Sequence, residues 1–403
     1  WQFSDARTVI LRKPQAPAQS LQLKALEVSV GARTSTSISE IPGTVWVVDQ
    51  VQLQEQLDTG VTLKEAIGKL VPGLDLAPEG RSNYGQNMRG RNVLVMIDGV
   101  SQNSSRGLSR QFDSISPFNV ERIEVLSGAS ALYGGGATGG IINIVTKKGT
   151  PGPAQFETEL SATSGFNNSD DLSSRISQSV SGGTDRVYGR LGISGEQNEA
   201  FYDGKGDQVF IDNTQTDLQY NRTLDLMGSL AIKLDDVQDL DLLAQYYDSG
   251  NNGSVGIYFP NLHDKAPSNL EDAEIRSGYD TDLEPRSKRL LFNANYHHAD
   301  LLGQDFYLQG SYRKEDNNFY PFPYYNAGKP QGSKGVYFAA SQQNFEVTSL
   351  KALFAKQWDS LKLTYGVDLD RERFNAEQSV FDSAISSESG GLDLVTQSKS
   401  PRY

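Results

Sequence analysis

From about residue 154 to the end, apolar and polar residues alternate along the chain in long runs with a period of two. The clearest run is Leu361 to Asp370, where Leu, Leu, Tyr, Val and Leu alternate with Lys, Thr, Gly, Asp and Asp. Successive side chains of a β-strand point to opposite faces, so this pattern predicts strands with one apolar and one polar face. We predict nine strands, near residues 154–164, 171–181, 186–196, 222–233, 239–248, 287–299, 305–315, 342–357 and 361–375.

The connections between these strands alternate in length. Short connections lie at 182–185, 234–238, 300–304 and 358–360, and long polar segments lie near 197–221, 249–286 and 316–341. This alternation is typical of outer-membrane β-barrels, and a soluble β-sandwich would not show it so strictly. We therefore expect residues 151–403 to form the N-terminal part of an antiparallel transmembrane β-barrel, about nine of roughly 22 strands. Ser400 to Tyr403 is predicted to be loop-like.

Residues 41–126 have the pattern of a compact α/β unit. Thr62, with Glu65 three residues later, forms a capping-box pattern at the start of a helix. Pro72-Gly73 then stops that helix. The predicted elements are strands at 44–48, 86–91 and 92–100, the first of them buried, and helices at 51–57 and 62–70.

A glycine-rich stretch closes this unit at residues 121–149, ERIEVLSGASALYGGGATGGIINIVTKKG. So many glycines between two β-rich runs predict sharp bends and close approach to neighbouring backbone. A phosphate-binding loop would need a helix with a lysine after the glycines, and β-branched residues follow here instead.

This stretch resembles the signature of the plug domain of TonB-dependent outer-membrane receptors. The segments LKEAIGKLVPGLDL, Arg89-Gly90 and Ile97-Asp98-Gly99-Val100 are similar to other plug segments of that family. The resemblance implies a mixed α/β plug domain at residues 40–150, inside the antiparallel transmembrane β-barrel. It also implies the outer membrane of a Gram-negative bacterium, with outer-membrane lipid and lipopolysaccharide around the barrel.

The residues before the plug divide into two parts. Trp1 to Leu11 is predicted to form one or two short strands, and residues 1–13 resemble the tail of the periplasmic signalling domain that some family members carry. That domain would imply an anti-sigma regulator as a partner. Residues 14–39 have the composition of a linker.

Within the linker, a short β-prone segment without a neighbour to pair with suits strand addition to a partner's sheet edge. In the family this position holds the TonB box, which implies the TonB–ExbB–ExbD energising complex as a partner. The box residues would be Leu26, Glu27, Val28, Ser29 and Val30.

The composition of the 403 residues excludes several classes of protein. There is no cysteine, which excludes a disulfide framework and thiolate metal sites. Three histidines, without a catalytic constellation or a metal-ligand motif, predict neither an enzyme nor a protein-held metal. The net charge of −13 argues against a nucleic-acid partner. No apolar run reaches the about 18 residues that would predict a membrane-spanning helix.

In this family the siderophore itself coordinates the iron, so the resemblance implies no cofactor and no metal ligands from the protein. Arginine suits a bulky anionic chelate, because it offers several donors to carboxylates in a fixed geometry. In two plug loops, 81–84 and 102–111, the candidate ligand-binding residues are Arg81, Asn83, Tyr84, Arg106 and Arg110. The aromatic candidates of the barrel loops are Tyr202, Tyr320, Phe322 and Tyr324.

Several segments narrow the resemblance to the ferric aerobactin receptors: RSNYGQNMRGR, DNTQTDLQY, FYPFP and the glycine-rich stretch. The implied ligand is ferric aerobactin or a similar citrate-hydroxamate chelate, whose free carboxylates suit the arginines. A catecholate siderophore and haem are alternatives, although only His263 lies in a predicted outer loop. A passive porin or adhesin would have no use for the plug motifs, and a barrel enzyme would need a catalytic set on inward strand positions.

Overall fold

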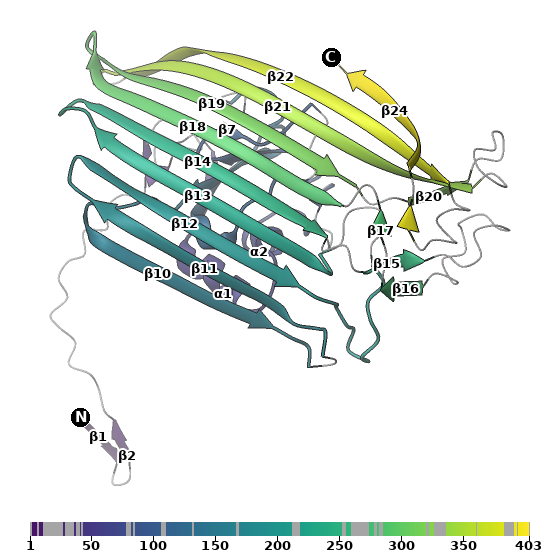
Figure 1. Ribbon diagram of the computed structural model, residues 1–403. Coiled ribbons are helices and arrows are strands. Elements are labelled where there is room, and N and C mark those ends of the chain that lie inside the picture. The colour runs from purple at the N-terminus through teal and green to yellow at the C-terminus, as the bar shows by residue number, and fades with distance from the viewer. Residues whose placement is uncertain are drawn as a thin grey trace.

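The computed structural model shows a long curved sheet wrapped around a smaller α/β domain (Figure 1). It describes residues 2–5, 8–10, 27–28, 36–37, 41, 43–77, 82–83, 85–105, 110–130, 133–166, 169–211, 218–251, 255–258, 274–277, 280–281, 285–319, 322–325, 336–359, 361–382, 391–392 and 394–402. No helix in these ranges is long and apolar enough to cross a membrane.

The α/β domain is built on a five-stranded sheet in the order β5-β8-β9-β6-β7. Its strands are β5 (Thr44–Val48), β6 (Val93–Ile97), β7 (Val100–Ser101), β8 (Val120–Ser127) and β9 (Gly140–Thr146). The neighbours β6 and β9 are parallel and fully buried, as strands covered on both faces require. β5 lies at the edge of the sheet and is largely part-exposed, so the prediction of a buried strand there is wrong.

Two helices, α1 (Gln50–Leu57) and α2 (Leu63–Leu70), pack their apolar sides on this sheet. The Thr62 side chain accepts from the backbone nitrogen of Glu65 at 3.4 Å, which confirms the predicted N-cap. A reciprocal capping box is present at α1, where Asp49 and Gln52 exchange hydrogen bonds of 2.9 and 3.2 Å. The sequence analysis did not single out that box.

Residues 86–91 form a turn and not the predicted strand. Met88 makes single bridges to Leu74 and Arg91, and Arg89 has a φ of 53°. The turn lies directly against the glycine-rich stretch, since a Cβ atom on Gly139 would be 2.6 Å from the carbonyl oxygen of Arg91. The close backbone approach predicted from the glycines is therefore confirmed.

The long sheet has eleven strands, ten of which follow one another in chain order and pair antiparallel. The ten are β10 (Gly152–Thr163), β11 (Ser173–Gly183), β12 (Val187–Asn198), β13 (Asn221–Lys233), β14 (Gln238–Asn251), β18 (Arg286–Leu301), β19 (Gln304–Asn318), β21 (Val336–Gln357), β22 (Lys362–Asp382) and β24 (Leu394–Arg402). The nine predicted strands are confirmed. The prediction of loop-like sequence at 400–403 is wrong, because β24 pairs with β22 through position 402.

Shorter strands lie in the long connections at one end of this sheet (Figure 1). β20 (Phe322–Tyr325) pairs with β21. β15 (Val255–Tyr258) pairs with β16 (Glu274–Ser277), and β17 (Asp280–Thr281) pairs with β23 (Gly391–Leu392). Short turns join the strands at the opposite end, which confirms the predicted alternation of connections.

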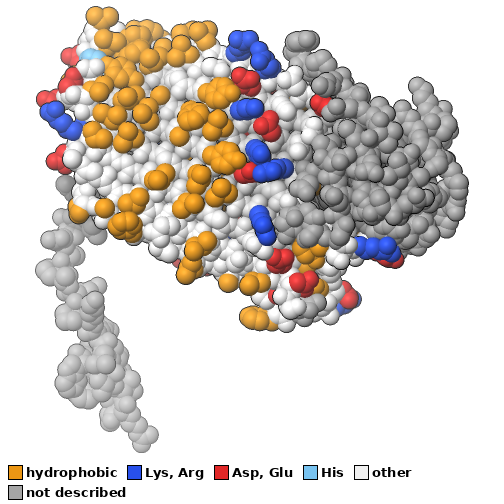
Figure 2. Space-filling view, viewed as in Figure 1, with side chains coloured by type: hydrophobic (Ala, Val, Ile, Leu, Met, Phe, Trp, Pro, Cys, Tyr) orange, Lys and Arg blue, Asp and Glu red, His pale blue; other side chains and the backbone are white. Residues whose placement is uncertain are grey.

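The long sheet is apolar outside and polar inside. On its outer face Phe156 and Leu160 are 73% and 74% exposed, and Figure 2 shows apolar side chains gathered over the middle of the sheet. On its inner face, polar side chains such as Asp225, Gln245 and Arg289 are buried. An outer face of this kind is stable in lipid, so the sheet has the pattern of a transmembrane barrel wall.

At the N-terminus, β1 (Gln2–Asp5) and β2 (Thr8–Ile10) pair antiparallel. The sequence predicts one or two short strands in this segment. β3 (Glu27–Val28) pairs antiparallel with β4 (Thr36–Ser37). The expectation that segment 26–30 has no neighbour is therefore wrong. Val28 is buried in an apolar cluster of the α/β domain, while Leu26, Ser29 and Val30 lie outside the described residues.

Candidate functional site

A cavity of about 390 Å³ lies between the flank of the plug domain and strands β10 to β13. This volume is within the range of small-molecule sites, about 300–1,000 Å³. Three charged side chains of its wall are in ion pairs: Asp113 lies 3.3 Å from Lys64, and Arg175 lies 2.9 Å from Glu159 and 3.7 Å from Glu196. The fourth, Asp171, accepts a hydrogen bond from Ser164 Oγ at 2.5 Å. No cluster of His, Asp or Glu that could hold a metal ion occurs in the described ranges.

Tyr202, a predicted ligand residue, lines this cavity. Its hydroxyl donates to Asp170 Oδ1 at 2.7 Å, and the backbone nitrogen of Ala200 donates to the Asp170 carbonyl at 2.8 Å. These bonds join the connection between β10 and β11 to the connection between β12 and β13. The ligand contact itself stays a prediction.

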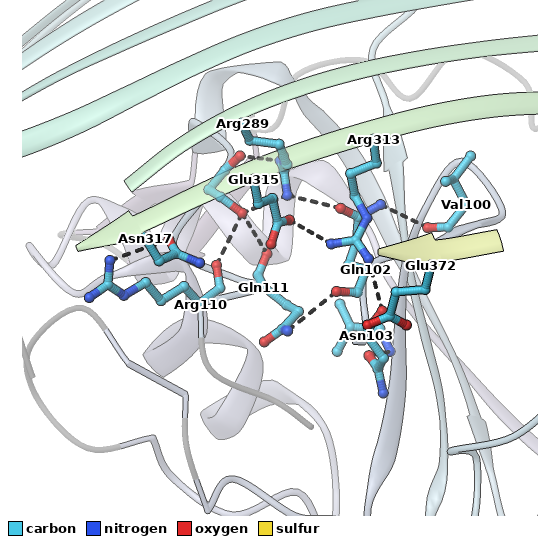
Figure 3. A network of polar contacts seen from close by, with 12 residues as sticks. Val100, Gln102, Asn103, Arg110, Gln111, Arg289, Arg313, Glu315, Asn317 and Glu372 are labelled. Carbon is cyan, nitrogen blue, oxygen red and sulfur yellow. Dashed lines mark hydrogen bonds and ion pairs between the residues drawn. The ribbon is translucent and has the colours of Figure 1, made fainter. Parts of the chain in front are cut away.

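Arg110, the second predicted ligand residue that the structure places, is 4% exposed and lies against the barrel wall (Figure 3). Its guanidinium donates to Ser287 Oγ, to Asn317 Oδ1 at 3.3 Å and to the Asn318 carbonyl at 3.2 Å. The Phe319 ring lies beside it, with 4.4 Å from Cζ to the ring centroid, a cation–π contact. These contacts join the plug to one end of β18 and β19, and the predicted ligand contact stays a prediction.

Arg289, on the inner face of β18, is fully buried against the plug. Its Nη1 donates to Gln102 Oε1 at 3.0 Å and to Ser114 Oγ at 2.5 Å. Its Nη2 donates to the Ser114 carbonyl and to Gln245 Oε1, the latter at 2.8 Å. The planar fork of five donors lets one guanidinium contact both ends of plug loop 102–114.

Arg313, on the neighbouring strand β19, is also buried against the plug. Its Nη2 donates to the Asn103 carbonyl at 2.8 Å, and its Nη1 pairs with Glu315 Oε1 at 2.7 Å. On β22, Glu372 Oε1 accepts from the backbone nitrogen and the hydroxyl of Ser105, at 3.0 and 2.8 Å. Arg289, Arg313 and Glu372 therefore bring three barrel strands to this one plug loop (Figure 3), and Gln245 of β14 adds a fourth through a 3.2 Å hydrogen bond to the Ser114 carbonyl.

A buried carboxylate holds the next plug segment. Asp225 of β13 accepts from the Ser116 backbone nitrogen at 2.7 Å and from Asn119 Nδ2 at 3.1 Å. Arg190 of β12 donates to Asn119 Oδ1 at 2.8 Å. These contacts position the short 3-10 helix at Pro117–Asn119.

Asn83, a further predicted ligand residue, is fully buried between the two plug loops. Its Oδ1 accepts from the Gln111 backbone nitrogen at 2.9 Å, and Gln111 Nε2 donates to the Gln102 carbonyl at 3.3 Å. Asn83 thus joins loop 81–84 to loop 102–111, and whether it contacts a ligand stays a prediction.

The other predicted residues are described only in part. Phe322 and Tyr324 lie in β20, where their backbones pair with positions 339 and 337 of β21. Four predicted ligand residues lie outside the described ranges: Arg81, Tyr84, Arg106 and Tyr320.

The sequence analysis missed Arg289, Arg313 and Asp225. A signal for them was present, because each occupies an inward position of a strand with alternating polarity. In a barrel wall such a position faces the lumen, where a charged side chain can meet polar groups of the plug.

At the opposite end of the plug, Lys148 lies near Asp98, whose carboxylate raises the pKa of Lys148 above its usual value. Asp98 also accepts from the backbone nitrogen and hydroxyl of Thr146, at 3.0 and 2.6 Å. Lys148 is therefore charged at neutral pH where the chain leaves the plug for β10.

Comparison with known proteins indicates which class of protein the chain resembles. Residues 37–141 match the family model of the TonB-dependent Receptor Plug Domain. The fold matches the unliganded ferric citrate transporter FecA with a TM-score of 0.63 at 18% identity, over 89% of this chain and 51% of that chain. It also matches the ferripyoverdine receptor of the outer membrane of Pseudomonas aeruginosa, with a TM-score of 0.59 at 18% identity, over 92% and 49% of the two chains. A plug inside a transmembrane wall is the arrangement of TonB-dependent outer-membrane receptors, and residues 37–141 belong to the plug-domain family of those receptors.

The similarity extends along nearly the whole chain to two siderophore receptors. The rhizobactin receptor of Rhizobium meliloti (strain 1021) is 42% identical over 397 residues, which are 96% of this chain and 52% of that protein. The ferric aerobactin receptor of Klebsiella pneumoniae is 41% identical over 399 residues, 98% of this chain and 54% of that protein. The chain thus spans about half the length of the curated relatives it matches. Both relatives are named as receptors, and the predicted resemblance to TonB-dependent receptors and the predicted outer-membrane location are confirmed.

Proposed function

We propose that this chain is part of a receptor that binds a ferric siderophore and carries it across the outer membrane with energy from TonB, ExbB and ExbD. The observation that carries the proposal is the identity of 42% and 41% with the rhizobactin and ferric aerobactin receptors, over plug and barrel alike. The apolar outer face of the sheet supports it, since that face requires lipid chains around the wall. We propose outer-membrane lipid and lipopolysaccharide as the surrounding molecules.

The ligand we propose is ferric aerobactin or a similar citrate-hydroxamate chelate. Its free carboxylates suit the guanidinium groups of the plug loops, Arg81 and Arg106 above all. Tyr202, Tyr320, Phe322 and Tyr324 would enclose the chelate from the barrel side. The siderophore supplies all iron ligands, so the protein needs no cofactor.

A panel of ferric complexes tests the ligand class. Quenching of intrinsic tryptophan fluorescence is measured for the receptor, as its gene encodes it, with ferric aerobactin, ferric citrate, a ferric catecholate and haem. We expect ferric aerobactin to quench at the lowest concentration. Quenching by the catecholate or by haem at lower concentration would contradict the proposal and support the corresponding alternative.

Segment 26–30 is proposed to be the TonB box, and TonB would engage it by strand addition. Val28→Pro removes a backbone donor, so iron uptake should stop while ferric siderophore binding stays unchanged. Because β3 pairs with β4, Thr36→Pro is the matched control: it disturbs the same pair from the partner strand. Radioactive iron uptake is measured for both variants, and normal uptake by Val28→Pro would contradict the assignment of segment 26–30 as the TonB box.

Residues 1–13 are proposed to be the end of a signalling domain, whose partner would be an anti-sigma regulator. The paired strands β1 and β2 support a folded element at this position.

A further inference from the structure

We propose that Arg289 and Arg313 of the barrel wall, together with Arg110 of the plug, are positioning residues that hold both ends of the ligand-binding plug loop in place. The loop is residues 102–114, called here the apex loop. The inference rests on the proposed function, because it concerns the same ligand site. It gives these three arginines a role that needs no contact with the ligand.

The first end of the apex loop is held by three barrel strands. Arg289 of β18 donates to the Gln102 side chain at 3.0 Å, and Arg313 of β19 donates to the Asn103 carbonyl at 2.8 Å. Glu372 of β22 accepts two hydrogen bonds from Ser105. These bonds involve charged partners, which makes them stronger than ordinary neutral hydrogen bonds.

The second end is held by two of these strands, β18 and β19. Arg110 donates to Ser287 of β18 and to Asn317 of β19. Arg289 also contacts this second end, because it donates to the hydroxyl and carbonyl of Ser114. One buried guanidinium therefore bridges the start and the end of the loop. Figure 3 shows its contact with Gln102.

Holding both ends matters because of what lies between them. Arg106, one of the three predicted ligand arginines, is one residue from Ser105 and four from Arg110 in the sequence. A loop whose ends are already ordered loses less conformational entropy when a ligand binds. The anchors should thus raise affinity for the chelate although they need not contact it.

A simpler explanation is that buried arginines attract an anion through their charge alone. The two explanations differ for Arg289→Lys, which keeps the charge but replaces a fork of five donors by a single ammonium group. Arg289→Lys should bind as the parent does if charge alone acts. If positioning acts, it should bind more weakly, since one Nζ cannot reach both ends of the loop.

The experiment measures binding and loop order separately. The chain has no cysteine, so Leu108→Cys introduces a single labelling site in the apex loop. The mobility of a spin label there is recorded in the ligand-free receptor, and the affinity for ferric aerobactin is measured by fluorescence in the receptor without the label. We expect Arg289→Gln, Arg289→Lys and Arg313→Gln to increase label mobility and to weaken binding about tenfold.

Arg190→Gln is the matched control. Arg190 is also a buried barrel arginine that contacts the plug, but it reaches Asn119 and not the apex loop. It should change neither label mobility nor affinity. Because removal of a fully buried arginine can also unfold the protein, the exposed Glu372 provides a second variant, Glu372→Gln, which should increase mobility to a smaller extent.

Unchanged label mobility in the Arg289 and Arg313 variants would overturn the proposal, whether or not binding weakens. An equal effect of Arg190→Gln would overturn it too, because the effect would then be general loosening of the plug. If the parent receptor binds none of the ferric complexes, the proposed function fails, and label mobility still decides whether the arginines hold the loop.

Discussion

The plug sheet and the barrel sheet bury opposite kinds of side chain. In the plug, the neighbouring strands β6 and β9 bury aliphatic residues such as Val95 and Ile142, both 0% exposed. In the barrel wall, Leu191 is 62% exposed while Arg289 is 1% exposed. Both sheets come from one chain with similar strand-forming residues. The comparison teaches that the surroundings of a strand, water or lipid, decide which of its faces is apolar.

The difference determines how the two parts can meet. Because the barrel presents many polar groups inward, hydrogen bonds hold the plug, with Asp225, Arg289 and Arg313 at their centre. Three inward apolar side chains of the barrel, Met227, Leu243 and Leu291, also pack into the core of the plug. Each such bond contributes modestly to stability, about 0.5–1.5 kcal/mol for a neutral pair and about 1.5–3 kcal/mol with a charged group. An interface of this kind can be loosened in steps, whereas an apolar core is lost cooperatively.

The strongest test of the comparison is a charge in the plug core. Ile142→Asp places a carboxylate without a partner among apolar side chains, which costs several kcal/mol and should unfold the plug. The barrel wall should persist, since its stability depends on lipid. Protease digestion of the plug is compared with the heat resistance of the barrel in detergent. Val51→Asp, at a position 67% exposed in α1, is the control and should leave both intact. Loss of the barrel in Ile142→Asp would show that the two parts fold as one unit.

A charge on the outer face of the wall should have the next largest effect. Leu191→Arg exposes a cation to lipid and should lower the free energy of unfolding by about 2–4 kcal/mol in vesicles. Val51 of the plug is similarly exposed, at 67% against 62% for Leu191. The matched variant Val51→Arg should change stability little, because this position faces water. Urea unfolding in lipid vesicles measures both. Equal effects at the two positions would remove the distinction between the water-facing and lipid-facing surfaces.

Removal of the proposed ligand arginines should have a smaller effect than the two charge substitutions above. Arg81→Ala and Arg106→Ala each remove a charged hydrogen bond to the chelate, and each should weaken ferric aerobactin binding about tenfold. Arg276→Ala is the control, because Arg276 is exposed and paired with Glu274 in an outer connection. Fluorescence titration compares the three variants. Affinities within twofold of the parent for Arg81→Ala and Arg106→Ala would mean that these arginines are only solvated.

The smallest effect is expected from the aromatic residues of the outer connection between β19 and β21. Tyr320→Ala and Phe322→Ala should raise the dissociation rate of the ferric siderophore several-fold and slow association less, since rings that exclude water strengthen polar contacts beneath them. Stopped-flow fluorescence resolves the two rates. Release at the parent rate in both variants would place these rings at the membrane interface and not over the ligand.

Local patterns in the sequence predicted much of this architecture. A period of two depends only on the order of residues, so all nine alternating strands of the barrel wall could be located. The N-cap at Thr62 follows from two residues three positions apart. Segment 394–402 lacks alternation and contains Pro401, and it becomes a strand only through its pairing with β22. Val28 likewise has a neighbouring strand and a buried place only because residues 36–37 and the plug sheet fold against it.

By itself, the sequence determined the class of the fold, the inward and outward positions of each alternating strand, and the loops that carry the candidate ligand residues. Only the tertiary structure decided which inward positions hold the plug. Arg289 meets Gln102 across 187 positions of sequence, and Arg110 meets Asn317 across 207. Alternation shows that Arg289 faces inward, but what lies opposite depends on how the plug docks within the wall. That docking is set by many weak contacts between distant segments, and no local pattern records them.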